Sequence, residues 1–310
     1  MRYLLCLELF LSLSFLSGCA NLMSNGSLDT AGLTASGAVA KGPTAKRLKA
    51  SGPVQIVFKP VLNHIDITNY YSRSTTHAYS DNELVKTLTD IANFTVKTKT
   101  VAVDNQNQTA TYDLTTIKKT GLVDLSDFAM PDLGETLELM LTNQGKVLRA
   151  GNYPPGTLFF VPPVSLPNKP VKVGDSWPMT SEWVSLKSGL PLKMKTLSTL
   201  RAIRKCGTTG RCAEIDLTGT VQLEPTRSEN DGSANKLPKF VSSMNGSLLF
   251  SLTRGTVLYS YLVSSESLSG KNTRIIIRSC MVSSVVKPSD ENLLGSVPVQ
   301  CRPLDQPPKY

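Results

Sequence analysis

The sequence predicts a mainly β protein, built as a single curved antiparallel sheet or as an unclosed β-barrel of two related meanders, with at most one or two short helices. From Pro53 onward, short apolar segments rich in β-branched residues alternate with polar turns, which is typical of antiparallel strands. The 310 residues include 19 prolines and 21 glycines, which excludes a coiled coil or a helical bundle as the main architecture.

The strands are expected in the following order. The first half offers strands at 54–58, 94–103, 112–116, 137–141 and 146–149, with polar turns at 104–108 and 143–145. The second half offers strands at 192–200, 215–217, 247–250, 257–263 and 273–277, with a turn at Arg254-Gly255. One helix is expected from Asp81, whose side chain could cap a run with Leu84, Leu88 and Ile91 at helical spacing.

These elements predict one β domain over 53–287. Its halves, 53–150 and 171–287, are joined by a proline-rich crossover that includes Pro154, Pro155, Pro162 and Pro163, since such a segment does not fit a central strand. A strand, a glycine turn and a second strand recur at 134–148 and 246–258. Duplication of a meander and chance recurrence explain this equally well, so both stay open.

The first 19 residues resemble the export signal of a bacterial lipoprotein. Arg2 precedes an apolar run, Leu4 to Leu16, that is too short to span ~30 Å of hydrocarbon. The run leads into Leu16-Ser17-Gly18-Cys19. These four residues resemble the lipobox of bacterial lipoproteins, the motif that ends in the acylated cysteine. The resemblance implies a signal peptide over 1–18 and acylation of Cys19, with palmitate among the expected acyl chains. Such a modification would anchor the protein to the membrane, because two or more acyl chains bind a bilayer stably. Ala20 is compatible with the outer membrane, so the expected location is the cell envelope, facing the periplasm.

Residues 19–52 are expected to be the lipidated N-terminus and a flexible linker, because Ser, Gly, Ala, Thr and Lys dominate them. No later segment has 18 consecutive apolar residues, so no transmembrane helix is expected. The formal net charge is +9, but nucleic acid is not an expected partner, since export separates the protein from it. A basic surface without a particular partner is the simplest interpretation of that charge.

Four cysteines remain beyond the signal and the lipid site, at Cys206, Cys212, Cys280 and Cys301. An even number in an exported chain predicts two disulfides, with three connectivities open. Cys206 and Cys212 flank an expected hairpin tip, which favours their pairing. The pair Cys280–Cys301 would then fasten the proline-rich tail 288–310. Zinc is not expected, because no C-x-x-C pair and no nearby histidine accompany these cysteines.

A second resemblance covers Leu166 to Trp177, and more loosely 130–265. The run Lys169-Pro-Val-Lys-Val-Gly-Asp-Ser-Trp177 resembles a motif of β-rich bacterial lipoproteins whose family has no assigned function. The resemblance implies no catalytic residue. From the residues themselves we expect a tight turn at Gly174-Asp175, with Trp177 buried at the start of a strand.

No catalytic site, metal site or cofactor is expected, because no familiar nucleophile elbow, zinc motif or phosphate loop is present. His64 and His77 fit solvated or hydrogen-bonded positions better than a metal site. Asp124, Asp127 and Asp132 fit a solvated turn better than acid–base chemistry.

Two functions stay open, and the sequence indicates no oligomeric state. The first is a non-enzymatic lipoprotein that binds or carries an apolar or lipid-like ligand. The second is a structural or interaction lipoprotein that holds an envelope protein or peptidoglycan. The first requires a hollow sheet interior and the second allows a filled one. The residues expected to line a ligand cavity are Phe94, Leu139, Phe160, Trp177, Phe250 and Tyr259.

The lipid anchor gives the most direct prediction. Cys19→Ser should abolish palmitate labelling and release the chain from the membrane fraction, because the sulfur that carries the acyl chains is gone. Cys6→Ser, which changes a cysteine inside the signal, is the matched control and should leave both readouts unchanged. A Cys19→Ser chain that still sediments with membranes, together with a parent that takes up no palmitate, would contradict the lipoprotein assignment.

Overall fold

The computed structural model describes residues 47–48, 52–121, 123–186, 189–206, 210–223, 239–270, 272–286 and 301. The predicted signal peptide, the lipidation site Cys19, most of the linker and all of the tail except Cys301 lie outside these residues. Within the described part, no helix is long and apolar enough to cross a membrane.

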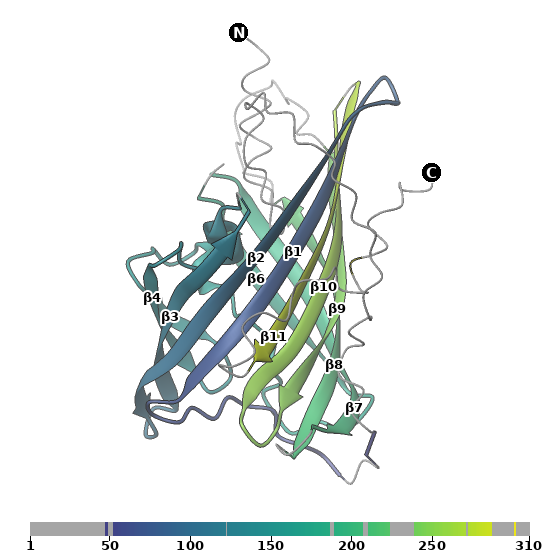
Figure 1. Cartoon of the computed structure of the whole chain (residues 1–310). Helices are drawn as coiled ribbons and strands as arrows, with labels where there is room; N and C mark the ends of the chain where they lie inside the picture. Colours follow the sequence, from purple (N-terminus) through teal and green to yellow (C-terminus); the bar gives the residue numbers. More distant parts are fainter. Residues whose placement is uncertain are drawn as a thin grey trace, which may run out of the picture.

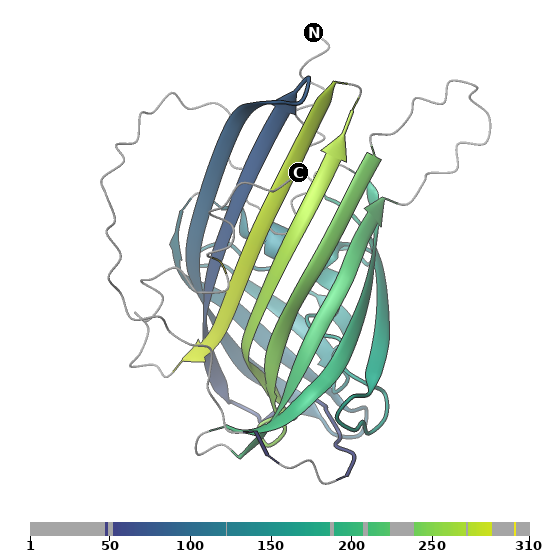
Figure 2. The ribbon, with the colours of Figure 1, turned by 90° about the vertical axis from the view of Figure 1, so that its right-hand side faces the viewer.

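The predicted fold class is confirmed: the protein is mainly β and forms one antiparallel sheet that does not close into a barrel (Figures 1 and 2). The two helical segments described are single 3-10 turns, η1 (Leu125–Phe128) and η2 (Leu158–Phe160). The strands are β1 (Ile65–Ser80), β2 (Glu83–Asp104), β3 (Thr109–Thr120), β4 (Thr136–Thr142), β5 (Val147–Ala150), β6 (Ser176–Val184), β7 (Pro191–Lys205), β8 (Arg211–Leu223), β9 (Lys239–Ser251), β10 (Thr256–Ser269) and β11 (Thr273–Val286).

The sheet consists of two meanders that meet in its centre. Its strand order is β5-β4-β3-β2-β1-β11-β10-β9-β8-β7-β6, so each meander pairs neighbours along the chain and β1 pairs with β11. The long register from Ile67–Val286 to Ser80–Thr273 joins them. The division into two related halves, 53–150 and 171–287, stays a prediction. Strands β5 and β6 are the free edges.

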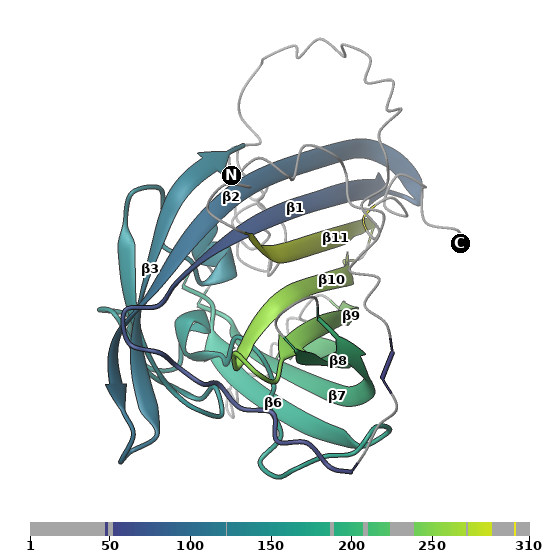
Figure 3. The same cartoon turned by 60° about the horizontal axis from the view of Figure 1, so that its bottom comes forward.

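The sheet curls strongly, and the same face of both meanders points inward (Figure 3). The crossover that contains η2 establishes which face this is. Leu158 and Val161 pack on the cluster that includes Trp183 of β6, whereas Phe159 and Phe160 belong with Leu141 of β4. One short segment therefore touches both ends of the sheet on its concave face. The edges are joined by apolar side chains and not by a hydrogen-bonded ladder.

One end of the sheet is covered by the chain that precedes β1, which crosses it in Figure 3. Val54 pairs with Val171, the Phe58 amide donates to the Asn143 carbonyl at 2.7 Å, and the Lys59 amide donates to the Gly255 carbonyl at 3.2 Å. Gly255 has φ +64°, and a Cβ there would lie 2.3 Å from the Lys59 nitrogen. Only glycine fits this close approach. Ile56, fully buried, completes a core cluster beneath the crossing chain.

The predicted helix from Asp81 to Ile91 is wrong. Asp81 and Asn82 have φ values of 49° and 67°, and they form the two-residue turn between β1 and β2. Positive φ at both central positions is the geometry of a type I′ hairpin turn, which Asp and Asn tolerate. The helical spacing of Leu84, Leu88 and Ile91 is coincidental, since all three lie in β2.

The expected turn before Trp177 is present. Gly174 has φ +98°, and the Lys172 amide donates to the Asp175 carboxylate at 2.8 Å. The Trp177 indole is 8% exposed and donates to the Ser165 carbonyl at 3.1 Å. The turn thus fixes the start of edge strand β6 against the crossover.

Both predicted disulfides are present, with the favoured connectivity. Cys206 pairs with Cys212 across the β7–β8 hairpin, with 5.9 Å between the Cα atoms. Cys280 of β11 pairs with Cys301, with 5.4 Å between the Cα atoms. The predicted linker needs one correction, because its residue Leu48 donates its amide to the Ile203 carbonyl at 2.8 Å. This part of the linker is therefore paired with the end of β7.

Candidate functional site

The six residues predicted to line a cavity do not form one site. Phe94 packs with Tyr70 and Phe128, at ring distances of 4.7 and 5.7 Å. Leu139 and Phe160 belong to the β4–β5 cluster. Trp177 and Phe250 belong to the cluster under the crossing chain. Five of the six therefore lie inside the curl of the sheet, but in three separate apolar clusters.

Tyr259 lies on the opposite, convex face. It packs with Tyr71 and Cys280 and against the Cys206–Cys212 pair. A β-bulge between Val257 and Tyr259 causes the difference, because register shifts there. Val257 opposes Phe250 on the concave face, while Tyr259 opposes Leu249 on the other. One extra residue reverses the facing of everything after it.

A band of small polar residues crosses the concave face between the apolar clusters. Strand register aligns Ser74 of β1 with Ser279 of β11 and Ser264 of β10. The same line continues through Met244 and Gly219 to Thr196 of β7. Glu266 lies one row further along, between Ser242 and Ile277, and Ile277 opposes Thr76. We call the following residues the polar band: Ser74, Thr76, Thr196, Ser242, Ser264, Glu266 and Ser279.

All residues of the polar band except the half-buried Thr76 are buried, and much of the band lacks hydrogen-bond partners among the described residues. Glu266 is 4% exposed and Ser279 is 0% exposed. The Glu266 Oε2 atom is buried without a partner, and so are four hydroxyl groups, those of Thr76, Thr196, Ser264 and Ser279. Buried polar groups are normally satisfied, and each one left alone costs about 1–3 kcal/mol.

A neighbouring serine pair shows that the same strands can satisfy hydroxyls. Ser260 and Ser283 oppose each other on the concave face and hydrogen-bond at 2.7 Å. Ser264 and Ser279 oppose each other across the same two strands, yet both hydroxyls are unpartnered within the described chain. The lack of partners is therefore a local property of the polar band and not of every serine on this face.

Glu266 is the ionisable residue of the polar band. Burial raises the pKa of its carboxyl from 4.5 to about 8, because a low-dielectric surrounding disfavours the charged form. Across the described concave positions of β6–β11, the register places two further titratable side chains, Lys205 and Arg211, which oppose each other at the far end of the β7–β8 pair and are both exposed. Beyond them, Asp90 of β2 aligns with Ser74, and burial raises the pKa of its carboxyl as well. Lys86 lies exposed near the hairpin tip.

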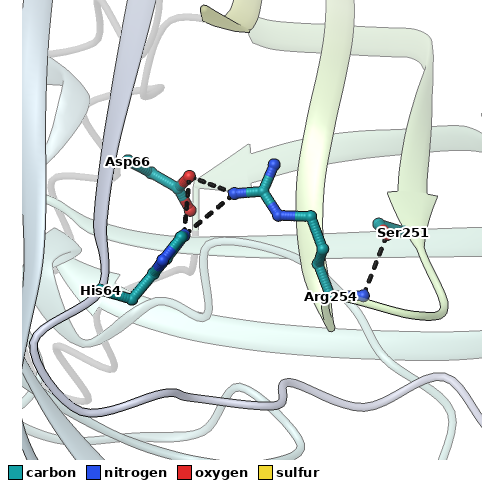
Figure 4. A network of polar contacts seen from close by, with 4 residues as sticks. All are labelled: His64, Asp66, Ser251 and Arg254. Atoms are coloured by element: carbon teal, nitrogen blue, oxygen red, sulfur yellow. Dashed lines mark hydrogen bonds and ion pairs between the residues drawn. The ribbon is translucent and has the colours of Figure 1, made fainter. Parts of the chain in front are cut away.

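A separate polar network joins the start of β1 to the β9–β10 turn (Figure 4). The Arg254 guanidinium donates to Asp66 and lies 3.0 Å from His64 Nε2, which is 3.2 Å from the Asp66 carboxylate. The Arg254 amide donates to Ser251 Oγ at 3.1 Å. Ser251 is fully buried on the other side of Arg254, so no nucleophile–base pair forms. The network thus links the β9–β10 turn to the start of β1, beside the crossing chain.

The remaining polar candidates have structural surroundings. His77 is 5% exposed, and burial, followed by the charge of Arg278, lowers its pKa. Asp124 caps η1 by accepting from the Ser126 amide at 3.0 Å, and Asp132 pairs with Lys119 at 2.7 Å. Among the residues that the structure describes, no group of three or more His, Cys, Asp or Glu side chains could hold a metal ion.

Comparison with known proteins adds no functional assignment. No protein-family model and no curated protein matches the chain. Eleven solved chains match weakly. One comes from work on the asymmetric conductivity of engineered proteins, at 9% identity and TM-score 0.26, covering 71% of this chain and 100% of that one.

Two further solved structures are similarly distant. DynF from dynemicin biosynthesis in Micromonospora chersina matches at 9% identity and TM-score 0.19, covering 80% of this chain and 93% of that one. An outer membrane channel from Pseudomonas putida F1 matches at 9% identity and TM-score 0.22, covering 76% and 100%. Such scores carry no argument about fold or function.

Glu266 gives a prediction about pH and stability. Between its ordinary pKa of 4.5 and the raised value of about 8, the folded chain holds one proton that the unfolded chain has lost. The free energy of unfolding should therefore fall as pH rises through this window, by up to about tenfold in the folding constant per pH unit, and then level off. Urea unfolding at pH 5, 6.5 and 8 measures this.

Glu266→Gln should remove that part of the slope and be more stable than the parent at pH 8. Glu182→Gln is the control, because the Glu182 side chain is 61% exposed. Equal slopes for the parent and Glu266→Gln would show that Glu266 is ionised in the folded protein at neutral pH.

Proposed function

We propose that this chain is a non-enzymatic, lipid-anchored protein of the cell envelope that binds an apolar or lipid-like ligand against the concave face of its sheet. The anchor is Cys19, and the proposed place is the outer membrane, facing the periplasm. The observation that carries the proposal is the polar band, because five of its polar atoms are buried without partners in the described chain and apolar clusters flank them.

The polar band is costly if stability alone matters. Apolar residues at these positions would bury more apolar surface and leave no polar atom unsatisfied. A ligand with a polar group at one end would supply partners to the hydroxyls and the carboxyl. Its apolar remainder would lie against the cluster that includes Leu262, Leu268 and Met244. Both requirements fit an amphiphilic molecule.

Access to this face has a structural basis in the free edges. Strands β5 and β6 share no ladder, and η2 lies between them through apolar contacts on both sides. Moving η2 would break side-chain packing without breaking a sheet. Met179 and Met194, which contact the same cluster, have flexible side chains that adapt to an inserted apolar chain.

The alternative function, attachment to another envelope component, is favoured by one feature. The β1–β2 hairpin extends past β3, which pairs with β2 only from Asn93 onward, and its turn lies beside the β10–β11 turn (Figure 1). Leu84 and Val85 near its tip are 52% and 61% exposed. Exposed apolar side chains at a projecting tip fit contact with a protein partner. A Leu84→Ser/Val85→Ser chain that loses a stoichiometric crosslinked partner, in a protein that binds no amphiphile, would favour this alternative.

Ligand binding can be read from tryptophan fluorescence. Trp177 and Trp183 are the only tryptophans of the chain, and both belong to concave-face clusters. A brominated neutral lipid, 9,10-dibromo-octadecan-1-ol, should quench the Cys19→Ser chain purified without detergent, because bromine quenches at contact range. Trp183→Phe should lose most of this quenching, and Trp177→Phe should keep it, since Trp183 shares its cluster with η2.

Octadecan-1-ol without bromine is the control and should leave the fluorescence intensity nearly unchanged. If the brominated alcohol does not quench the chain at any concentration below its own aggregation, the proposed function is wrong.

A further inference from the structure

We propose that the polar band is a subsite for a cationic amine, so that the ligand is an amphiphile with an ammonium head and an apolar tail. This inference rests on the proposed function and specifies the chemistry of the same face. It stands on three observations: the acidic character of the buried Glu266, the polar atoms around it that lack hydrogen-bond partners, and the apolar side chains that flank it.

The charge of the interior is opposite to that of the whole chain. The chain carries a formal net charge of +9, yet the buried titratable group that the described β6–β11 strands turn inward is the acid Glu266, because the concave basic residues Lys205 and Arg211 are exposed at the far end of the β7–β8 pair. Asp90 lies on the adjoining row of the same face. The nearest basic residues on the concave face of β2 and β3 are placed away from it, Lys86 near the exposed tip and Lys119 in an ion pair with Asp132 at 2.7 Å.

The partners favour a donor with several hydrogens. The Glu266 Oε2 atom and the hydroxyls of Ser264, Ser279 and Thr76 have no hydrogen-bond partner among the described residues. Hydroxyls both donate and accept, whereas an ammonium group only donates, with up to three hydrogens. One carboxylate and two hydroxyl oxygens on adjacent strands match these three donors. A carboxylate ligand could pair only with the protonated form of Glu266, whereas an ammonium ion pairs with its ionised form.

The apolar residues beside Glu266 would strengthen an ion pair between its carboxylate and an ammonium group. Glu266 is flanked on its own strand by Ser264 and by buried Leu268, and on the next strand by Ile277, which is 6% exposed. Apolar surroundings strengthen an ion pair and penalise an unpaired charge. The raised pKa of the Glu266 carboxyl, about 8, shows that the free protein keeps this group neutral, so that an ionised Glu266 requires a cationic partner beside it.

Binding has a defined proton balance. Below pH 8 the free protein holds a proton on Glu266, and the amphiphile is already an ammonium ion in water. Formation of the ion pair leaves the ammonium intact and transfers the Glu266 proton to solvent. One proton is therefore released for each ligand bound, and affinity rises by up to about tenfold per pH unit between pH 6 and 8.

The experiment compares two probes with the same tail, dodecylammonium chloride and dodecan-1-ol, by titration calorimetry on the Cys19→Ser chain. The ammonium should bind at least about tenfold more tightly than the alcohol, which is the scale of one charge-assisted hydrogen bond. Glu266→Gln should abolish this preference, so that the two probes bind with equal affinity. Glu182→Gln, on the convex side of β6, is the matched control and should keep the preference.

Proton release provides a second readout that needs no variant. Titrations at pH 6.5 in two buffers of different ionisation enthalpy should show about one proton released per ammonium bound and none per alcohol. Equal affinity for the two probes, or ammonium binding without proton release, would overturn the amine subsite and leave the proposed function intact. Binding of neither probe would overturn both.

Discussion

The two edge strands of the sheet, β5 and β6, approach each other without forming a hydrogen-bonded ladder. An antiparallel sheet of eleven strands that curls this far brings its ends together, yet β5 and β6 are not hydrogen-bonded to each other. In place of a ladder, η2 and the following Val161 supply four side chains, two packed on each half. Phe159 is 2% exposed and the other three are half-buried, and a fully buried side chain of this kind contributes about 1.5–3 kcal/mol. This packing can be lost locally without unfolding the strands.

The two ends of the concave face differ in the polarity of their side chains. The covered end carries a dense apolar cluster with Ile56, Leu200 and Phe250, all 0% exposed, under a chain held by backbone bonds. Beyond that end, where η2 packs on the cluster with Met244 and Leu268, the inward face also carries the serines, the two threonines and Glu266 of the polar band. Proteins tend to break local rules of core composition at functional sites. The contrast between the two ends supports a division in which one end stabilises the fold and the other binds.

Most of the fold could be predicted from the sequence, because alternation, turns and cysteine spacing are local signals. The hairpin at 104–108 is one example, where Asp104 accepts from the amides of Gln106 and Asn107 at 2.9 and 3.0 Å. The helix at 81–91 was a wrong prediction because three apolar residues in a long strand coincide with helical spacing. The turn residues Asp81-Asn82 were the better signal, since both tolerate positive φ.

The candidate site was much less predictable. Tyr259 is among the residues predicted to line the cavity, and the bulge that turns it to the other face has no signature in the local sequence. Glu266 lies in the run Ser264-Ser-Glu-Ser267, which looks like a solvated strand. Its facing could have been inferred from Leu262 and Leu268, which share its parity. The polar band itself depends on the register of strands from β1 to β7, and that register is a property of the folded sheet alone.

Hydrogen–deuterium exchange tests the open edge most directly. If η2 side chains alone join the two edges, peptides from β5 and β6 should exchange their outward amides orders of magnitude faster than peptides from the central strands β1 and β11. A Leu158→Ala/Phe159→Ala chain should widen this difference without changing protection in the centre. Equal, slow exchange at β5, β6 and the centre would contradict the claim, because it would mean that the edges pair and the sheet is closed.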